Sequence, residues 1–141
     1  MALIVVGIDG SEHSKKALRW ALDEARLRGA SLRAVYAWTM PVYFGYGVTA
    51  AVLDPQSLRA AAKENLDKAV DAVAGGVKDV SIDRRAVEGL AAQVLVDEAK
   101  DADLLVVGSR GHGGFTGLLL GSVSQQCAHH APCAVVIVRE A

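Results

Sequence analysis

The feature that most constrains the fold is a regular alternation of short apolar runs with longer segments of helical periodicity. The first run, 3–8, ends at Asp9-Gly10-Ser11, and apolar residues then recur at helical spacing as far as Gly29. The same change of period continues along the chain. It predicts strands over 3–8, 32–38, 80–86, 103–108 and 133–138. It predicts helices within 11–29 and over 55–74, 89–100 and 121–131.

Five strands that alternate with four helices indicate an α/β fold: a single doubly wound, five-stranded parallel sheet with helices on both faces. The strands are nearly continuous runs of Val, Ile and Leu, as expected when both faces are covered. No linker, repeat or low-complexity tract divides the 141 residues, so we expect one domain over 1–141. Ligands of such sheets bind at the carboxyl ends of strands, where Asp9, Ala37 and Gly108 stand.

Composition and charge narrow the choice of partners and location. With 15 basic and 16 acidic residues the net charge is −1, which provides no basic field for nucleic acid or an anionic membrane. No apolar run approaches a membrane span, and the N-terminus is interpreted as a first strand and not as a signal peptide. Two cysteines, Cys127 and Cys133, agree with a reducing compartment. We therefore expect a cytoplasmic location, with neither nucleic acid nor membrane as a partner.

The strongest functional signal is the Gly-rich stretch 108–122, which follows a buried strand and leads into a helix. Gly108-Ser-Arg-Gly111, nine further residues and Gly121-Ser122 form the pattern G-x2-G-x9-G-S. Gly108 and Gly111 would allow a positive φ and the close approach of a phosphate, because neither has a Cβ atom. Gly121 and Ser122 would open a helix whose free N–H groups and positive dipole end attract an anion. The spacing thus predicts a phosphate site.

Other interpretations of this stretch agree less well with the sequence. The glycines could serve only the tight turns between a strand and a helix. A Walker A loop is excluded because no Lys precedes a Ser or Thr anywhere in the sequence. A Rossmann G-x-G-x-x-G loop is excluded because Thr116 stands where the third glycine after Gly111 and Gly113 would be.

Taken together, these motifs resemble those of the universal stress protein family, in particular its ATP-binding subgroup, which carries G-x2-G-x9-G-[ST] after the fourth strand. The similarity extends to Asp9-Gly10-Ser11 after the first strand and to Tyr36-Ala37 in the second. It also includes the lead-in segment 102–111 and the Pro-Cys-Ala-Val-Val-Ile-Val ending at 132–138. The resemblance covers the whole chain and implies a Rossmann-like fold, similar to the adenine nucleotide alpha hydrolases, with strand order 3-2-1-4-5.

The resemblance also implies a site for ATP or another adenine nucleotide, with Mg²⁺ or Mn²⁺ bound to it. The main chain at Gly7, Ile8 and Ala37, with Val107, would frame the adenine. Asp9 would hold the ribose or the divalent ion. The phosphates and ribose would be surrounded by Gly108, Arg110, Gly111, Gly121, Ser122, Val123 and Ser124. Family members often carry Pro or Val where this sequence has Gly7, so the wall beside the adenine is expected to be looser here.

Several alternatives stay open at the level of the sequence. An identical adenosine pocket would serve cyclic AMP or AMP, so these ligands are not separated from ATP. Asp9 could be only a helix N-cap, and Arg110 only a solvated loop residue. A hydrolase or kinase would need a general base beside the γ-phosphate, and Asp9 is the one convincing acid. We therefore expect at most slow hydrolysis or autophosphorylation, in a protein that the resemblance places in stress response or signalling.

Three further features bear on metal binding and partners. A zinc site would use the cluster Cys127, His129, His130 and Cys133. We disfavour it because Cys133 should begin a buried strand just after Pro132. The loop 39–53 carries three aromatic residues and could cover a ligand or meet a partner. The last strand, 134–138, is apolar and expected at a sheet edge, so we predict a homodimer through it, as the resemblance also implies.

Overall fold

The computed structural model describes residues 2–40, 54–110 and 120–139. Strands and helices alternate within these residues, as the sequence predicts. The strands are β1 (Leu3–Ile8), β2 (Ser31–Trp38), β3 (Ile82–Glu88), β4 (Leu104–Gly108) and β5 (Ala134–Val138). The helices are α1 (Glu12–Arg28), α2 (Pro55–Ala74), α3 (Ala91–Glu98) and α4 (Ser122–His130), and a short 3₁₀ turn, η1 (Ala99–Asp101), follows α3.

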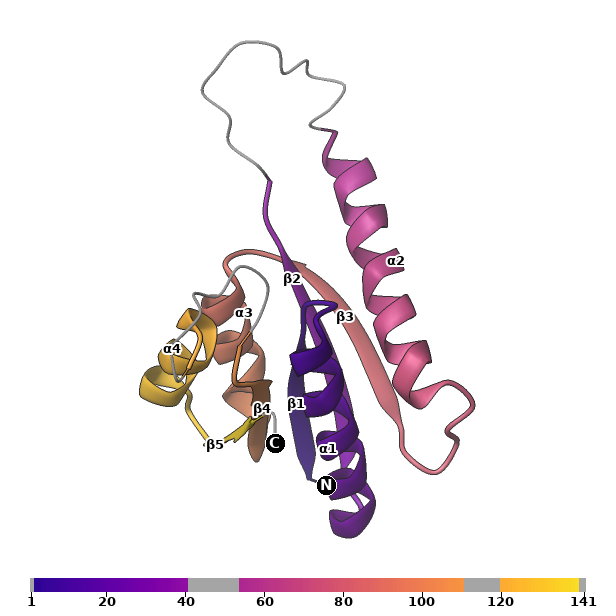
Figure 1. Ribbon diagram of the computed structural model, residues 1–141, viewed down its shortest axis with the longest axis vertical. Helices are drawn as coiled ribbons and strands as arrows, with labels where there is room; N and C mark the ends of the chain where they lie inside the picture. Colours follow the sequence, from indigo (N-terminus) through magenta and orange to yellow (C-terminus); the bar gives the residue numbers. More distant parts are fainter. Residues whose placement is uncertain (1, 41–53, 111–119, 140–141) are drawn as a thin grey trace.

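The five strands form one parallel sheet in the order β3-β2-β1-β4-β5 (Figure 1). Helices α1 and α2 pack into one core cluster, and α3 and α4 pack into another. This arrangement confirms the doubly wound parallel sheet and the strand order that the resemblance implied. β1 pairs with β2 on one side and with β4 on the other, so the order of the strands reverses between β1 and β4.

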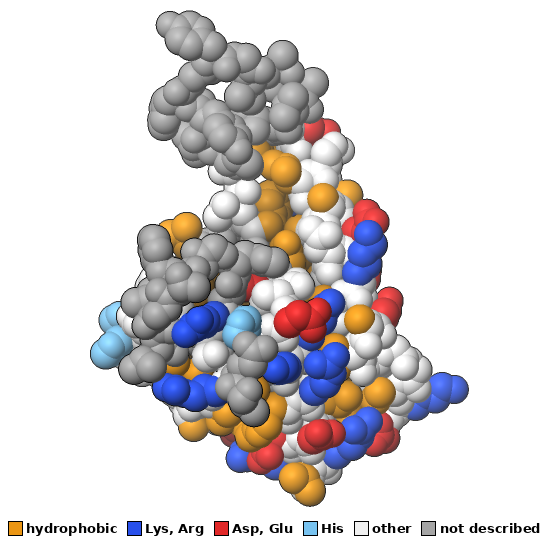
Figure 2. Space-filling model, in the orientation of Figure 1, with side chains coloured by type: hydrophobic (Ala, Val, Ile, Leu, Met, Phe, Trp, Pro, Cys, Tyr) orange, Lys and Arg blue, Asp and Glu red, His pale blue; other side chains and the backbone are white. Residues whose placement is uncertain are grey.

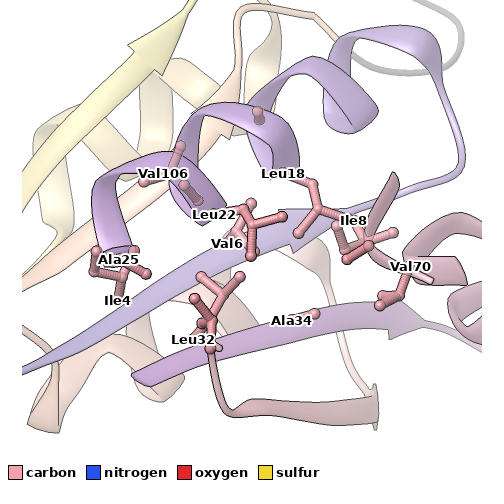
Figure 3. Close-up of a cluster of buried hydrophobic side chains, with 14 of the residues drawn as sticks. Ile4, Val6, Ile8, Leu18, Leu22, Ala25, Leu32, Ala34, Val70 and Val106 are labelled. Carbon is pink, nitrogen blue, oxygen red and sulfur yellow. The ribbon is translucent and has the colours of Figure 1, made fainter. Parts of the chain in front are cut away.

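Alternate residues of each strand point to opposite faces of the sheet. From β1, Ile4, Val6 and Ile8 enter the cluster beneath α1 and α2, whereas Val5 enters the cluster beneath α3 and α4. Figure 3 shows the first cluster, in which Ile4, Val6 and Ile8 meet apolar residues of α1 such as Leu18. Because both faces bury apolar surface at the centre of the sheet, β1 and β4 are continuous apolar runs without polar alternation, whereas the edge strand β3 carries charged residues.

The helices begin and end where the sequence supplies capping groups. Ser11 caps α1, since its side chain accepts a hydrogen bond from the Ser14 N–H. Gly29 ends α1 with φ of 62°, a left-handed conformation that strains residues with a Cβ. Asp54 caps α2 through the Gln56 N–H, directly before Pro55 at the first helical position.

The third strand differs from its predicted bounds. The apolar pattern predicts 80–86, whereas β3 runs over Ile82–Glu88. Its register with β2 extends from Leu32 opposite Ile82 to Trp38 opposite Glu88. Val80 is buried, as an apolar residue in this pattern should be, but it lies before the paired segment. The extent of this edge strand is therefore set by its single partner strand and not by its own hydrophobicity.

Acidic and basic side chains are intermixed on the face of the molecule shown in Figure 2. Several pair between neighbouring elements. Arg84 of β3 donates hydrogen bonds to Asp67 and Asp71 of α2, over 3.0 Å and 2.7 Å. The hydrogen bond from Arg84, followed by that from Lys63, holds the pKa of Asp67 below its usual range. These pairs attach α2 to the edge strand β3.

Truncation of a core leucine on α1 should reveal how much the first cluster contributes to stability. Leu18 is fully buried, whereas Leu27 on the same helix is 83% exposed. We expect Leu18→Ala to lower the free energy of unfolding by about 2–5 kcal/mol, because it leaves a cavity. The matched control Leu27→Ala should change it by less than about 0.5 kcal/mol. Urea denaturation followed by circular dichroism measures both, and equal effects would contradict the packing described here.

Candidate functional site

The candidate site lies at the carboxyl edge of β1 and β4, where the strand order reverses. Val6 is opposite Val106 in this pairing, so Ile8 and Gly108 end level with each other. Asp9 follows Ile8 directly and therefore lies beside the end of β4. The other neighbour of β1 is β2, which carries Ala37 near its own carboxyl end. The structure thus brings the predicted strand-end residues to one edge of the sheet, at the usual ligand position of this fold class.

Asp9 belongs to a tightly bonded turn between β1 and α1. Its Oδ1 accepts a hydrogen bond from the Ser11 N–H at 2.8 Å, and its own N–H donates to Ser14 Oγ at 3.3 Å. The Ser14 hydroxyl donates in turn to the Ser11 carbonyl at 3.0 Å. Gly10 makes the turn with φ of 84°. Because Ser11, and not Asp9, supplies the capping side chain of α1, the alternative that Asp9 is the N-cap is wrong.

Gly108 is required for close packing of a helix on the sheet. A Cβ atom at this position would lie 2.8 Å from the His13 carbonyl oxygen, in the first turn of α1. Gly108 is absent from the glycines with positive φ in the described residues, so the predicted left-handed conformation is wrong for it. The absent side chain instead lets the start of α1 lie directly against the end of β4.

Gly7 has a similar packing role on the opposite face of the sheet. A Cβ atom there would lie 2.8 Å from Leu95 Cδ1 and 3.6 Å from Val107 Cγ1. Leu95 of α3 therefore fills the volume that a larger residue at position 7 would occupy. On this face of the sheet Leu95 therefore compensates for the absent side chain.

The start of α4 is held to the end of β4 through the main chain of Ser109. The Ser109 carbonyl accepts hydrogen bonds from the Gly121 N–H at 2.6 Å and from the Ser124 hydroxyl at 3.1 Å. Its N–H donates to the Val138 carbonyl at 3.0 Å. Gly121 is the N-cap of α4, and no side chain caps this end within the described part of the chain. By helix geometry, the N–H groups of the first turn have no intrahelical acceptor.

The other predicted site residues range from buried to exposed. Ile8 and Val107 are 4% and 3% exposed, so only their main chain could contact a ligand. Ala37, Arg110 and Val123 are half-buried, and Ser122 is exposed and accepts a hydrogen bond from Gln126. Gly111 lies outside the described residues, as do Tyr43 and the other loop aromatics.

Three residues of this edge have roles that the sequence did not predict. Ser14 and Ser109 make the hydrogen bonds that close the two strand-to-helix connections. Leu95 completes the wall beside Gly7. Ser14 stands three residues after the N-cap Ser11, a spacing that could have identified it. Ser109 acts through its main chain and Leu95 through its position in space, so no sequence signal marks them.

The Cys and His residues near the C-terminus do not form a metal site among the residues that the structure describes. Cys127 is fully buried, and burial raises the pKa of its thiol to about 11. Cys133 is half-buried and lies just before β5, so it is less buried than the sequence pattern suggests. His129 and His130 are exposed in the last turn of α4, where cations interact favourably with the helix dipole.

A surface depression of about 400 Å³ lies elsewhere, at the C-terminal end of α1. Arg26 and Asp79 form an ion pair at its rim, with 2.7 Å between Nε and Oδ2. It contains none of the residues predicted for the nucleotide. The predicted site and this depression are thus separate features of the molecule.

The family model for the universal stress protein family matches residues 1–139. A universal stress protein of Mycolicibacterium smegmatis is 38% identical, in an alignment that covers 96% of this chain and 45% of that protein. The chain thus spans less than half the length of the curated relatives it matches. No helix in the described residues is long and apolar enough to cross a membrane.

Solved structures of universal stress proteins have the same fold. The UspA protein of Lactobacillus plantarum superimposes with a TM-score of 0.81 at 24% identity, covering 98% of this chain and 97% of that one. A universal stress protein in complex with cAMP gives a TM-score of 0.72 at 32% identity, with coverage of 98% and 96%. A third structure, from Arabidopsis thaliana with AMP bound, gives 0.64 at 21% identity, with coverage of 100% and 93%.

The family match extends over almost the entire chain, and the fold, the strand order and the Gly-rich connection agree with it. This chain belongs to the universal stress protein family.

Proposed function

We propose that this chain binds an adenine nucleotide, ATP, at the carboxyl edge of β1 and β4. The observation that carries the proposal is the start of α4, where a glycine takes the N-cap position and no side chain in the described residues caps the helix. N–H groups at such an end attract an anion, and the helix dipole adds to the attraction. The phosphates would lie here, close to Gly108 and Arg110.

The start of α1 supports this choice by contrast. It too faces the carboxyl edge, but the Ser11 side chain already accepts the hydrogen bond of the Ser14 N–H. The α4 end has no such side-chain acceptor within the described residues, so its first-turn N–H groups meet less competition for a ligand. We therefore propose the β4–α4 side for the phosphates and the β1–α1 side for the ribose or a cation.

Asp9 is suited to the second task. Its carboxylate is half-buried, and its orientation is fixed by the Ser11 N–H at 2.8 Å. A carboxylate oxygen is a preferred ligand of Mg²⁺ or Mn²⁺, and it also accepts hydrogen bonds from ribose hydroxyls. We assign to Asp9 the ribose or the divalent cation that accompanies the phosphates.

The adenine would meet main chain more than side chains. Ile8 and Val107 direct their side chains into opposite core clusters, so their peptide groups form the edge between β1 and β4. The main chain at Gly7 and Ala37 would complete the surroundings of the base. Recognition through peptide groups suits an adenine, which presents both donors and acceptors at its edge.

A second candidate ligand is cyclic AMP or AMP. It is favoured by the relative at 32% identity whose structure was solved in complex with cAMP. The adenosine part of the site would be the same, and the ligands would differ in how many phosphates reach the start of α4. In either case we propose a cytoplasmic role in stress response or signalling, with at most slow hydrolysis or autophosphorylation.

We further propose that two copies pair through β5. The two edge strands of the sheet differ sharply in character. β3 carries Asp83, Arg84, Arg85 and Glu88, and charges on an edge strand oppose pairing with another chain. β5 is Ala-Val-Val-Ile-Val, and its residues are half-buried or exposed. An apolar unpaired edge of this kind is stabilised by a second strand.

Identification of the nucleotide in freshly purified protein tests the main proposal. Denaturation should release an adenine nucleotide, which chromatography distinguishes as ATP, AMP or cyclic AMP. Calorimetry with ATP and magnesium should give saturable binding to protein freed of ligand. If no nucleotide is released and none of the three binds, the proposal is wrong.

Gly121→Val tests where the phosphates bind. Gly121 has φ of −76° and ψ of 168°, a conformation that valine adopts readily, so the fold should be retained. Its branched side chain would obstruct the first turn of α4, and we expect ATP binding to be lost. Gly108→Ala should instead lower stability, by about 1–3 kcal/mol, because its Cβ atom would meet the His13 carbonyl. Wild-type affinity in a folded Gly121→Val variant would place the phosphates elsewhere.

Light scattering tests the dimer, which should be the main species at micromolar concentration. Ile137→Lys introduces a charge on β5 and should give a monomer that is still folded by circular dichroism. Val87→Lys is the matched control on β3, since Val87 is half-buried against the same core cluster as Ile137. A monomeric wild type, or a dimer unaffected by Ile137→Lys, would contradict the assignment.

A further inference from the structure

The hydroxyl group of Ser124 is directed into the protein, away from the surface where a ligand would bind. Ser124 is 2% exposed. Its Oγ lies 2.9 Å from the Gly121 carbonyl and 3.1 Å from the Ser109 carbonyl. Both are acceptors, so the single hydroxyl proton is shared between the N-cap residue of α4 and the residue that follows β4. The side chain therefore joins the end of a strand to the start of a helix.

Ser109 is itself fixed from two directions. Its N–H donates to Val138 at the end of β5, and its carbonyl accepts from the Gly121 N–H. It is buried, at 5% exposure. Two donors from the first turn of α4, one from the main chain and one from Ser124, thus converge on one carbonyl that the sheet holds in place.

Ser14 of α1 provides a comparison within the same molecule. Like Ser124, it is the third residue of its helix, and its hydroxyl donates to the carbonyl of the N-cap residue, Ser11. It also accepts from the Asp9 N–H at the end of β1. The two helices that follow β1 and β4 are therefore joined to their strands by serines at equivalent positions. In α1 the N-cap side chain adds a further bond, which Gly121 cannot supply in α4.

We propose that Ser124 is a positioning residue, which sets the place of the first-turn N–H groups of α4 relative to the end of β4 and does not itself contact the nucleotide. This inference rests on the proposed function, because it concerns how those N–H groups meet the phosphates. It changes the role that the family resemblance implied for Ser124, from ligand contact to support of the main chain that makes the contact.

Removal of the hydroxyl should leave the fold intact. The Ser109 carbonyl would keep the hydrogen bond from the Gly121 N–H, and the Gly121 carbonyl would keep the one from the Gln125 N–H at 3.0 Å. Loss of a buried hydrogen bond is most damaging when it leaves a partner unsatisfied. Neither acceptor would be left unsatisfied here. The effect of Ser124→Ala should therefore appear in ligand affinity and local motion.

The test compares ATP with adenosine, which lacks phosphates. Calorimetry measures the affinity for ATP with magnesium, and NMR titration measures the weaker binding of adenosine. For Ser124→Ala we expect ATP affinity to fall about three- to tenfold, the range that one hydrogen bond contributes, with adenosine affinity unchanged. Ser124→Thr should restore ATP affinity, because a helical threonine hydroxyl also reaches the carbonyl three or four residues before it.

Cys127→Ala is the matched control for general loosening of α4. Cys127 is fully buried one turn further along the helix and has no part in the proposed site. It should leave the ratio of ATP to adenosine affinity unchanged. The proposal is overturned if Ser124→Ala keeps the wild-type ratio, or if Cys127→Ala changes the ratio as much as Ser124→Ala does.

Hydrogen exchange of the ligand-free protein separates this inference from the proposed function. In Ser124→Ala the Gly121 amide should exchange faster than in the wild type, with the amides of β4 unaffected. An unchanged Gly121 amide would refute the positioning role, even if the wild type binds ATP. A wild type that binds no adenine nucleotide would refute the proposed function, and the exchange rates would still decide whether Ser124 holds the start of α4.

Discussion

The parallel pairing of β1 with β4 is the interaction on which the rest of the structure depends. β1 also pairs with β2, so it is the strand from which the sheet extends in both directions. Because the order reverses here, the connections that follow β1 and β4 both start at neighbouring strand ends and lead into helices on opposite faces. Gly108 makes this possible, since any side chain there would meet the first turn of α1. The position of the candidate site is a consequence of this pairing.

The helices α1 and α4 are capped differently at their N-terminal ends, which both lie at this edge of the sheet. In α1 the Ser11 side chain accepts a hydrogen bond from the Ser14 N–H. In α4 the N-cap is a glycine, Gly121, whose N–H donates to the Ser109 carbonyl. An N-cap side chain satisfies one of the first-turn N–H groups of its helix, whereas a glycine at the N-cap has no side chain that could accept such a bond. Of the two helix starts, that of α4 is therefore the one with no side-chain cap among the described residues.

Much of the fold could be predicted because the signals were local. The periods of strands and helices are set within short stretches of sequence, and the structure has the strands and helices at or close to their predicted positions. The predictions that differ concern contacts between distant segments. The bounds of β3 depend on β2, and the reason for Gly108 depends on His13, which is 95 positions away in the chain. No local pattern carries that information, and the residues 111–119 of the Gly-rich connection lie outside those described.

The sequence by itself determined the α/β class, the family and the set of strand-end residues that meet at one edge, because periodicity and short motifs are properties of neighbouring residues. Only the tertiary structure decided what those residues do. It showed that Gly7 and Gly108 make room for Leu95 and for α1, that Ser11 and not Asp9 caps α1, and that the Ser124 hydroxyl is directed inward to Ser109. The physical reason is that packing and hydrogen bonding depend on distances in space, and these are set when strands far apart in the sequence pair side by side.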